Sequence, residues 1–395
     1  MPAGDAGPAG AVLAVNGGSS SLKTALFDGS LQLLAKVSVP RLADGVLHAD
    51  IGGVLHADIG GARTTSRAAG DPLVGVLAAL REAGAPEPAV VVHRFVHGGL
   101  LDGPRRLDEG VLAELGRLAD WAPLHQRQAL ADVARTRRLL PAAQQVGCFD
   151  TLFGLGMAEE AARLPVPDEL WRAGIRRYGF HGLSYQGVVE TMGEQRLGRA
   201  VLAHLGNGSS LAAVAGGRCV ESSMGVTPEG GVPSGTRTGD LDPGLLLYLL
   251  DAGWTVERLR TLVQRQGGLA GLSGGTSDMA ELLGRTDQPA RLAVAVYCRR
   301  VAMQVGAYAV ALGGLDSLVF TGGIGEHAAP VREAVCAGLV HLGVELDTER
   351  NADDATPAGV PRVISRGSVE VSVVSADEEA TMAAQATRFL ASVPG

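Results

Sequence analysis

Three segments rich in glycine and hydroxyl residues could bind phosphate groups. They read NGGSSS (16–21), LGNGSS (205–210) and TGGIGE (321–326), and each follows an apolar run typical of a buried strand. Backbone N–H groups in such turns can point at phosphate oxygens, because glycine lets the backbone approach closely. One such turn is usually an ordinary hairpin, whereas three of them favour a nucleotide-binding protein. The chain contains no GxxxxGK[ST], so it is not a P-loop enzyme.

Charged side chains recur beside glycine at the expected ends of strands. They are Arg94 in HRFVHGG, His125 in APLHQ, Asp150 after a short strand, His181 in RRYGFHG and Arg237 in SGTRTGDLDP. Any one of them alone would more often make a salt bridge or a cap. Their repeated position at strand ends is where α/β folds bind ligands.

These residue types suit phosphoryl transfer to a carboxylate. Such a transfer needs positioning and charge stabilisation more than covalent help. Arginine offers planar bidentate contacts to phosphate or carboxylate, and Asp, Glu and Asn offer hard oxygens for Mg²⁺. A carboxylate acceptor has a pKa of roughly 4 to 5 and is ionised at pH 7, so no general base is needed. Cations must instead bring two anions together, and Arg94, Arg237 and His181 could do so.

The elements that carry these residues repeat in order. Residues 11–15 and 22–27 predict a β-hairpin around the first glycine turn. A strand over 199–205, the GNGSS turn and strands over 211–215 and 218–222 repeat that order. The repeat predicts two related α/β domains facing one cleft, which is the usual ligand site and could close to exclude water.

The remaining segments predict further helices and strands and one irregular region. Helices are expected over 72–83, 108–119, 243–253, 255–266 and 287–312, and strands over 89–92, 145–149, 317–320 and 370–374. Residues 41–70 are expected to be loosely structured. They contain the octapeptide GVLHADIG twice in tandem at 45–60. Two copies are too few for a solenoid and indicate a local duplication.

The composition excludes several classes of protein. The chain has 34 basic and 42 acidic residues, a net charge of −8, and therefore no electrostatic footprint for nucleic acid or anionic lipid. Its four cysteines are far apart and form no CxxC, which is typical of reduced thiols in a cytosol. The first ten residues lack the basic region of a signal peptide, and no apolar run approaches a membrane span. We expect a soluble, cytoplasmic protein.

Ten motifs resemble, in order, those of the acetate kinase family. They are VNGGSSSLK (15–23), HRFVHGG (93–99), APLH (122–125), FDT (149–151), RRYGFHG (176–182), HLGNGSS (204–210), SSMGVTP (222–228), GTRTGDLDP (235–243), SGGTSDM (273–279) and FTGGIGE (320–326). The resemblance implies a duplicated actin-like (ribonuclease H-like) α/β fold with two domains around a central cleft. Residues 1–151 with about 380–395 would form one domain, and 152–379 would form the other and carry most of the nucleotide site.

The resemblance also implies a role for each matching residue. Arg94 and Arg237 resemble the pair that grips the carboxylate and the transferring phosphoryl group. His181 resembles the transition-state histidine, and Asp150 resembles the acid that orients an active-site arginine. The residues that resemble the magnesium site, where Mn²⁺ could substitute, are Asn16 and Glu378. Those that match the nucleotide and phosphate site are Ser19, Ser21, Lys23, His204, Gly206, Asn207, Gly208, Asp278, Met279, Gly323, Ile324 and Gly325. Those that match the substrate pocket, besides Arg94, are Val96, Leu124, His125, Phe180 and Pro228.

The implied reaction is reversible, Mg²⁺-dependent phosphoryl transfer from ATP to acetate, giving acetyl phosphate and ADP in a homodimer. A propionate or butyrate kinase, a catalytically lapsed nucleotide-binding homologue and a nucleotide-switched binding protein are the alternatives. The last of these would have no use for Arg94, Arg237 and His181 together.

Four positions depart from the family pattern. Gln126 replaces the usual Asn, Gly154 the usual His and His327 the usual Asn, while Glu229 is displaced by one place. None of the four belongs to the proposed charge cluster.

Overall fold

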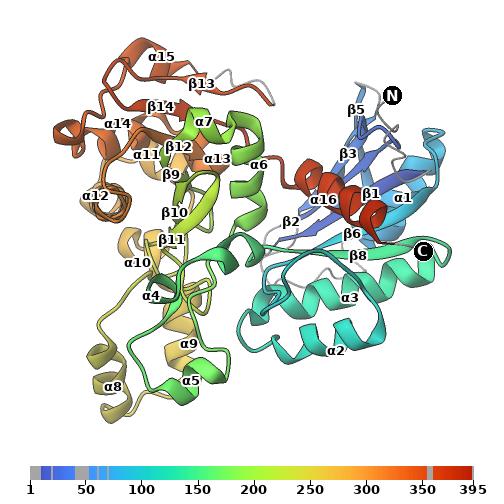
Figure 1. Ribbon diagram of the computed structural model, residues 1–395, viewed down its shortest axis with the longest axis horizontal. Coiled ribbons are helices and arrows are strands. Elements are labelled where there is room, and N and C mark those ends of the chain that lie inside the picture. Colours follow the sequence, from blue (N-terminus) through green and yellow to red (C-terminus); the bar gives the residue numbers. More distant parts are fainter. Residues whose placement is uncertain are drawn as a thin grey trace. The chain divides into compact units, whose positions relative to one another are not determined.

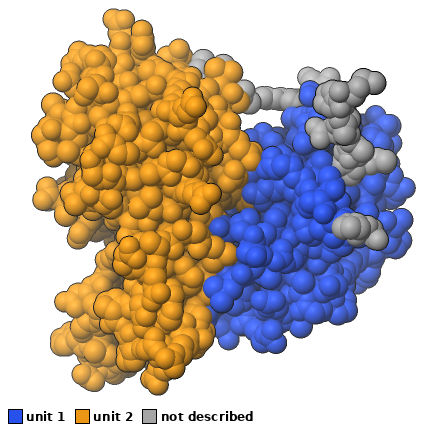
Figure 2. Space-filling view, viewed as in Figure 1, with its two compact units in different colours: residues 1–152, 377–395 blue, residues 153–376 orange. Residues whose placement is uncertain are grey.

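The computed structural model describes residues 10–18, 21–40, 53–59, 62–68, 71–353 and 359–393. The chain forms two compact units, shown in different colours in Figure 2: unit 1 comprises residues 1–152 and 377–395, and unit 2 comprises residues 153–376. Glu378, which the expected boundary assigned to the C-terminal domain, therefore lies in unit 1.

Unit 1 is built on a mixed sheet in the order β5-β4-β3-β2-β1-β6-β8-β7 (Figure 1). Strands β1 and β2 pair antiparallel, whereas β1, β6 and β8 run parallel. Alternate residues of β1, Ala11, Leu13 and Val15, pack with helix α1 in one apolar cluster, as expected for side chains two positions apart in a strand. The strands are β1 (Ala11–Gly17), β2 (Ser21–Phe27), β3 (Leu33–Pro40), β4 (Gly53–Ile59), β5 (Ala62–Ala68), β6 (Pro88–Phe95), β7 (Arg105–Arg106) and β8 (Gln144–Phe149), and the helices are α1 (Pro72–Glu82), α2 (Glu109–Arg117), α3 (Pro123–Leu139) and α16 (Glu378–Ser392).

Unit 2 repeats the inner part of this topology. Its sheet has the order β11-β10-β9-β12-β14-β13, so both sheets contain an antiparallel three-strand meander followed by parallel strands. This repetition confirms the duplicated actin-like fold. The strands are β9 (Arg199–His204), β10 (Ser210–Ala215), β11 (Arg218–Ser222), β12 (Ser317–Thr321), β13 (Arg362–Val363) and β14 (Glu370–Val373).

Helices cover the two faces of the unit 2 sheet. Val201 and Ala203 of β9 pack in a cluster with α12, whereas Ala200 and Leu202 pack in another with α6. The 24-residue α12 contributes Tyr297 to the first cluster, fully buried. The helices are α4 (Glu159–Ala162), α5 (Asp168–Arg172), α6 (Gly182–Met192), α7 (Glu194–Leu197), α8 (Pro243–Asp251), α9 (Val256–Arg265), α10 (Gly268–Ser273), α11 (Met279–Gly284), α12 (Gln288–Ala311), α13 (Gly322–His327), α14 (Ala329–Ala337) and α15 (Thr348–Ala352), with short 3₁₀ turns at Leu152–Gly156 and Val340–Leu342. No helix among the described residues is both long and apolar enough to cross a membrane.

The structure corrects two expectations. Residues 53–59 and 62–68 are not irregular: β4 and β5 form a hairpin that pairs with the otherwise open edge of β3. An unpaired edge offers a row of backbone donors and acceptors, which explains why a polar insertion folds onto it. The second copy of the octapeptide forms β4, and the first copy, 45–52, lies outside the described residues. Arg94 does not follow its strand but lies within β6.

Gly154, one of the departures from the family pattern, is required by close backbone packing. A Cβ atom at Gly154 would lie 1.9 Å from the carbonyl oxygen of Tyr178. The oxygen belongs to the backbone, so it can move away only if the segment before His181 shifts. In the same turn, a Cβ at Gly156 would meet nothing within 4 Å.

We therefore predict that Gly154→Ala lowers the free energy of unfolding by about 1–3 kcal/mol, the usual cost of overpacking. Gly156→Ala is the matched control and should change it by less than about 0.5 kcal/mol. Urea unfolding of both variants and the wild type measures the difference. Equal stability of the two variants would show that the Tyr178 carbonyl does not constrain position 154.

Candidate active site

Arg94 is the centre of a hydrogen-bonded charge cluster in unit 1. Its guanidinium donates to Oδ2 of Asp150 from Nε at 2.9 Å and from Nη2 at 2.7 Å. Nη1 donates to Oδ1 of Asn16 at 3.0 Å and lies 2.8 Å from Oε2 of Glu378. These four residues come from β6, the end of β8, β1 and the start of α16, so one side chain joins four elements. The sequence predicted all four as site residues, and the structure brings them together.

Two residues that the sequence did not predict complete this cluster. Glu379 is 3% exposed and accepts a hydrogen bond from Nδ2 of Asn16 at 2.6 Å. Lys36 of β3 lies 3.3 Å from Oε2 of Glu379. Lys36 therefore offsets the charge of Glu379, while Arg94 offsets the charge of Glu378. Two signals in the sequence could have indicated these residues. One is the pair of glutamates in ADEEA, and the other is the scarcity of lysine, since the chain contains only Lys23 and Lys36.

The carboxylates around Arg94 favour the protonated form of its guanidinium. Burial by itself would lower the pKa of Arg94, but the neighbouring charges of Asp150, Glu378 and Glu379 outweigh it and raise that pKa above its ordinary value. Arg94 therefore stays a cationic guanidinium.

The same cluster contains suitable donors for a hard cation. Asn16 and Glu378 offer an amide and a carboxylate oxygen, and Asn16 Nδ2 donates to Glu378 Oε2 at 2.9 Å, which fixes both side chains. Among the described residues there is no group of three or more His, Cys, Asp or Glu side chains able to enclose a metal. Mg²⁺ retains several waters and is often bound by one or two carboxylates plus substrate phosphates, so this donor set fits it.

In unit 2, two histidine rings stack at the N-terminus of α6. The rings of His181 and His204 have centroids 4.1 Å apart and planes inclined by 20°. Nδ1 of His181 lies 2.8 Å from Oγ of Ser210, and Nδ1 of His204 lies 2.8 Å from Oγ of Ser184. Both rings are thereby held at Nδ1, which directs Nε2 to the opposite side. His181 has φ 59°, an unusual left-handed conformation for a residue with a side chain.

The backbone of the GNGSS turn lies against His181 and Arg237. A Cβ on Gly208 would stand 3.2 Å from both Nε2 of His181 and Nη1 of Arg237. Arg237 is 9% exposed, and its Nη1 donates to the carbonyl of Pro228 at 3.3 Å. Five predicted residues thus lie together in unit 2, around a glycine that leaves space between the His181 ring and the Arg237 guanidinium. They are His181, His204, Asn207, Gly208 and Arg237. This is the geometry that an anionic phosphoryl group requires.

The segment that carries Arg237 is locked to the GNGSS turn. Gly235 N donates to the carbonyl of Asn207 at 2.9 Å, and Ser209 N donates to Oγ of Ser234 at 2.9 Å. Gly268 is required where this segment turns, because a Cβ there would lie 2.1 Å from the Ser234 carbonyl, and its φ is +58°. The position of Arg237 therefore depends on the backbone, not on the side chain alone.

The other predicted nucleotide residues occupy varied positions. Asp278 caps α11 by accepting from Glu281 N at 3.0 Å, and Met279 is buried in the core. In the TGGIGE turn, Ile324 N and Gly325 N donate to the Leu205 carbonyl, so these two N–H groups are already used. Gly206 precedes Asn207 in its turn, and Gly323 lies in the first turn of α13. Ser19 lies outside the described residues, whereas Ser21 and Lys23 lie in β2.

The residues predicted for the acyl pocket are divided between the two units. Val96 is buried in unit 1, and Leu124 and His125 lie in the first turn of α3. Phe180 and Pro228 are buried in unit 2. The grouping of these residues around one substrate stays a prediction.

Two of the other three family departures have local structural partners. Gln126 is fully buried and bonds the backbone of the HGG segment, since its Nε2 donates to the His97 carbonyl at 2.8 Å. Glu229 accepts from Nε2 of Gln264 at 3.0 Å, and His327 is exposed in the last turn of α13. None of these contacts involves the charge clusters.

Comparison with known proteins bears on the family of this chain. The model of the acetokinase family matches residues 11–384. An acetate kinase of Streptomyces avermitilis is 39% identical over 404 aligned residues, covering 95% of this chain and 96% of that protein. The chain belongs to the acetokinase family. It is therefore a kinase, and the resemblance seen in its ten motifs is confirmed.

Solved structures of family members share the fold. An acetate kinase of Porphyromonas gingivalis superposes with a TM-score of 0.82 at 34% identity, covering 97% of this chain and all of that one. A propionate kinase of Francisella tularensis superposes with a TM-score of 0.85 at 30% identity, covering 95% and 98%. Since both kinds of kinase have this fold, the fold does not select the acyl substrate.

Beside Arg94 in β6, His93 titrates abnormally. It is 1% exposed, and its Nε2 lies 2.8 Å from Oε1 of Gln145. Burial lowers the pKa of His93 to about 4; the Gln145 hydrogen bond opposes this shift, and the charge of Arg137 adds to it.

We predict that His93 makes the protein less stable in mild acid. Between pH 6.5 and 4 the unfolded chain binds a proton that folded His93 does not, so the free energy of unfolding falls as the pH falls. From pH 7.5 to 5 this contribution is about 2 kcal/mol. Urea unfolding at pH 7.5 and at pH 5 measures how much free energy of unfolding is lost in acid. This loss should be smaller in His93→Gln than in the wild type by about 2 kcal/mol. The same loss in both proteins would contradict the shifted pKa.

Proposed function

We propose that this protein is an acetate kinase, which moves the γ-phosphoryl group of ATP reversibly to acetate and yields acetyl phosphate and ADP. The observation that carries this proposal is the pair of polar clusters, Arg94 with its carboxylates in unit 1 and Arg237 with the stacked histidines in unit 2. Both act on the same substrates in the proposed reaction. Membership of the acetokinase family and the acetate kinases among the relatives support it.

In this reaction an oxygen of the acetate carboxylate bonds to the γ-phosphorus while the bond from phosphorus to the ADP oxygen breaks. Acetate is ionised at neutral pH, so no residue has to remove a proton. Two anions must approach each other, and positive charge offsets their repulsion. We assign Arg94 to the acetate carboxylate and Arg237 and His181 to the transferring phosphoryl group. Asp150 orients Arg94 through its two hydrogen bonds.

The nucleotide and metal assignments follow from the same chemistry. Asn207, Gly208 and His204 serve the phosphates of ATP, and Asn16 and Glu378 would hold Mg²⁺ or, in its place, Mn²⁺. When bound, the cation neutralises charge on the phosphates. We also retain the adenosine assignment of Asp278, Met279, Gly323, Ile324 and Gly325 and the phosphate assignment of Ser19, Ser21, Lys23 and Gly206.

The substrate preference depends on the apolar pocket assigned to Val96, Leu124, Phe180 and Pro228, with His125 beside it. One methylene is worth only about 1–3 kcal/mol of discrimination, so propionate should also react. The propionate kinase among the structural neighbours makes that acid the second candidate substrate, and butyrate the third.

A hydroxamate assay tests the proposed function. Purified protein, ATP, Mg²⁺ and hydroxylamine are incubated with acetate, propionate or butyrate in parallel. Acyl hydroxamate should form fastest with acetate. A maximum with propionate or butyrate would keep the mechanism and correct the substrate, and ATP binding without any product would indicate a lapsed enzyme.

In that assay we predict that Arg237→Ala lowers kcat on the order of 10²–10³-fold, as expected when one preorganised charge-stabilising group is lost. Arg237→Lys should recover only part of the loss, because lysine lacks the planar fork. Arg291→Ala, which removes an exposed arginine of α12, is the control and should leave kcat unchanged. A rate close to that of the wild type for Arg237→Ala would refute the role assigned to Arg237.

We further propose a homodimer that acts in the cytoplasm. The apolar face of α8 supports the dimer, because Leu247 and Tyr248 are 64% and 68% exposed and helices rarely leave such side chains in water. All four cysteines are buried and free, as suits a reducing compartment. Light scattering should give twice the 40.5 kDa chain mass, and Leu247→Glu should give the monomer mass. A wild-type protein of monomer mass would contradict the dimer.

A further inference from the structure

The ring of His181 is held by a chain of two hydroxyl groups in unit 2. Nδ1 of His181 lies 2.8 Å from Oγ of Ser210, and the same oxygen lies 2.5 Å from the phenol oxygen of Tyr185. Ser210 is fully buried and Tyr185 is 1% exposed, so both contacts lie inside the protein. Neither of the two residues belongs to the site predicted from the sequence.

Two local elements bring these groups together. His181 is the N-cap of α6, and Tyr185 follows four residues later, so the two side chains lie on the same side of the first turn. The backbone N–H of Tyr185 donates to the His181 carbonyl at 3.0 Å, which fixes this spacing. Ser210 begins β10 and lies opposite His204 at the end of β9. The turn between these two strands contains Gly208.

A second contact between a hydroxyl and an imidazole joins the same helix and hairpin. Nδ1 of His204 lies 2.8 Å from Oγ of Ser184, in the first turn of α6. The helix therefore holds the histidine of the hairpin, and the hairpin, through Ser210, holds the histidine of the helix. Rotation of either ring would break one of these contacts, so the stacked pair is fixed in orientation.

The chemistry of the two hydroxyls decides in which direction the chain donates. Ser210 has one hydroxyl hydrogen and two close partners, so it donates to one partner and accepts from the other. A phenol is more acidic than an aliphatic alcohol and is the stronger donor, which favours donation from Tyr185 to Ser210. The hydrogen of Ser210 is then left for Nδ1 of His181. Because Nδ1 accepts, the proton of the neutral ring is on Nε2.

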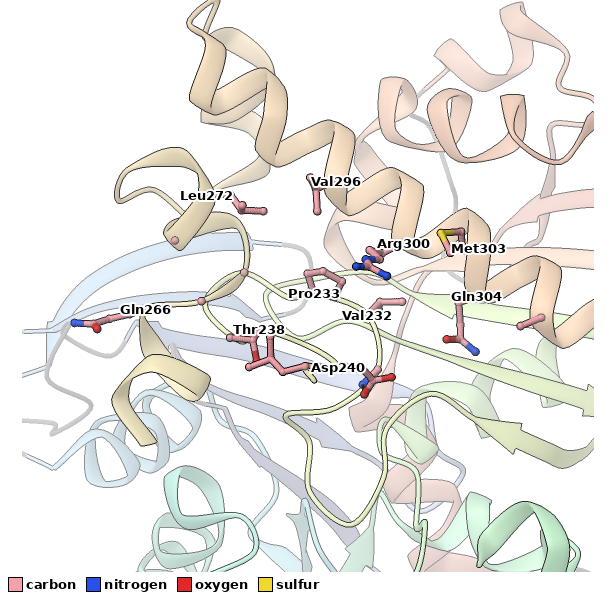
Figure 3. A pocket seen from close by; sticks show the side chains of 16 residues that line it. Val232, Pro233, Thr238, Asp240, Gln266, Leu272, Val296, Arg300, Met303 and Gln304 are labelled. Atoms are coloured by element: carbon pink, nitrogen blue, oxygen red, sulfur yellow. Dashed lines mark hydrogen bonds between the residues drawn. The ribbon is translucent and has the colours of Figure 1, made fainter. Parts of the chain in front are cut away.

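This tautomer points an N–H group into the space at Gly208. A Cβ on Gly208 would stand 3.2 Å from Nε2 of His181 and 3.2 Å from Nη1 of Arg237. Arg237 reaches this glycine from a separate loop, whose Pro233 and Thr238 line a pocket beside α12 (Figure 3). Two donors from different segments therefore converge on one space. The opposite tautomer would turn a nitrogen lone pair towards an anion bound there and repel it.

We propose that Tyr185 and Ser210 are positioning residues that keep His181 in the neutral form with its proton on Nε2. His181 then stabilises the transferring phosphoryl group as a fixed hydrogen-bond donor, and Arg237 supplies the full positive charge. The contact with the phosphoryl group rests on the proposed kinase function. The tautomer is a property of the chain without substrates and can be tested by itself.

The tautomer is tested by two-bond ¹H–¹⁵N spectra of histidine-labelled protein at pH 7.5, without ATP or acetate. His181, identified by the signal that is missing in His181→Gln, should show the pattern of an Nε2–H ring. Tyr185→Phe keeps the aromatic ring that packs beside Phe153 and removes only the hydroxyl, so the Nδ1–H form should become populated. Tyr178→Phe, which removes a phenol that donates to the Gly174 carbonyl, is the control and should keep the wild-type pattern.

The proposal is overturned if the wild-type His181 ring carries its proton on Nδ1 or protons on both nitrogens. An unchanged tautomer in Tyr185→Phe would refute the role of Tyr185, and an unchanged tautomer in Ser210→Ala would refute the role of Ser210. Since no turnover is measured, these results remain valid even if the protein fails the hydroxamate assay.

The effect on catalysis is tested in the hydroxamate assay. Tyr185→Phe should lower kcat about tenfold, less than the loss of a direct charge-stabilising donor. The KM values for ATP and acetate should change less than about twofold, because the affected hydrogen bond stabilises the transition state more than the bound substrates. An unchanged kcat despite a changed tautomer would refute the catalytic part. Equal losses in Tyr185→Phe and Tyr178→Phe would show only a general effect of removing a buried hydroxyl.

Discussion

The charge of Arg94, whose side chain is only 13% exposed, is the constraint on which the organisation of unit 1 depends. A guanidinium removed from water needs carboxylates in return, and their loss would leave an isolated buried charge. Asp150 supplies one carboxylate from the end of β8. Glu378 supplies another from α16, a helix that begins more than 280 residues after Arg94 in the chain. The ion pair therefore selects where the C-terminal helix docks, and it fixes Asn16 in the same network.

In unit 2, a backbone turn lies against the basic side chains of the predicted site. His181, His204 and Arg237 gather basic groups, and the turn around Gly208 lies against two of them without a side chain. The unusual φ of His181 and the close approach at Gly268 are local costs that this arrangement requires. Hydrogen bonds between the GNGSS turn and the 233–240 segment hold it in place, so the site is preorganised by main chain.

Two of the departures from the family pattern, Gly154 and Gln126, are explained by their local packing. Gly154 lies where the Tyr178 carbonyl leaves no room for a side chain, and the longer Gln126 reaches the His97 backbone. These positions surround the segments before His181 and after Arg94, which places the divergence of this chain in the supports of the site and not in its charged groups.

The sequence alone determined the family, the repeated strand order and most elements, because glycine turns after apolar runs and ordered motifs are local signals. Through the family resemblance, it also predicted Arg94 and Asp150 as catalytic residues and Asn16 and Glu378 as metal ligands. It did not reveal Lys36 or Glu379, the hairpin over 53–68, or the position of Arg94 inside β6. Each of these was decided by contacts between distant segments: a carboxylate that needs a counter-charge and a strand edge that needs backbone partners.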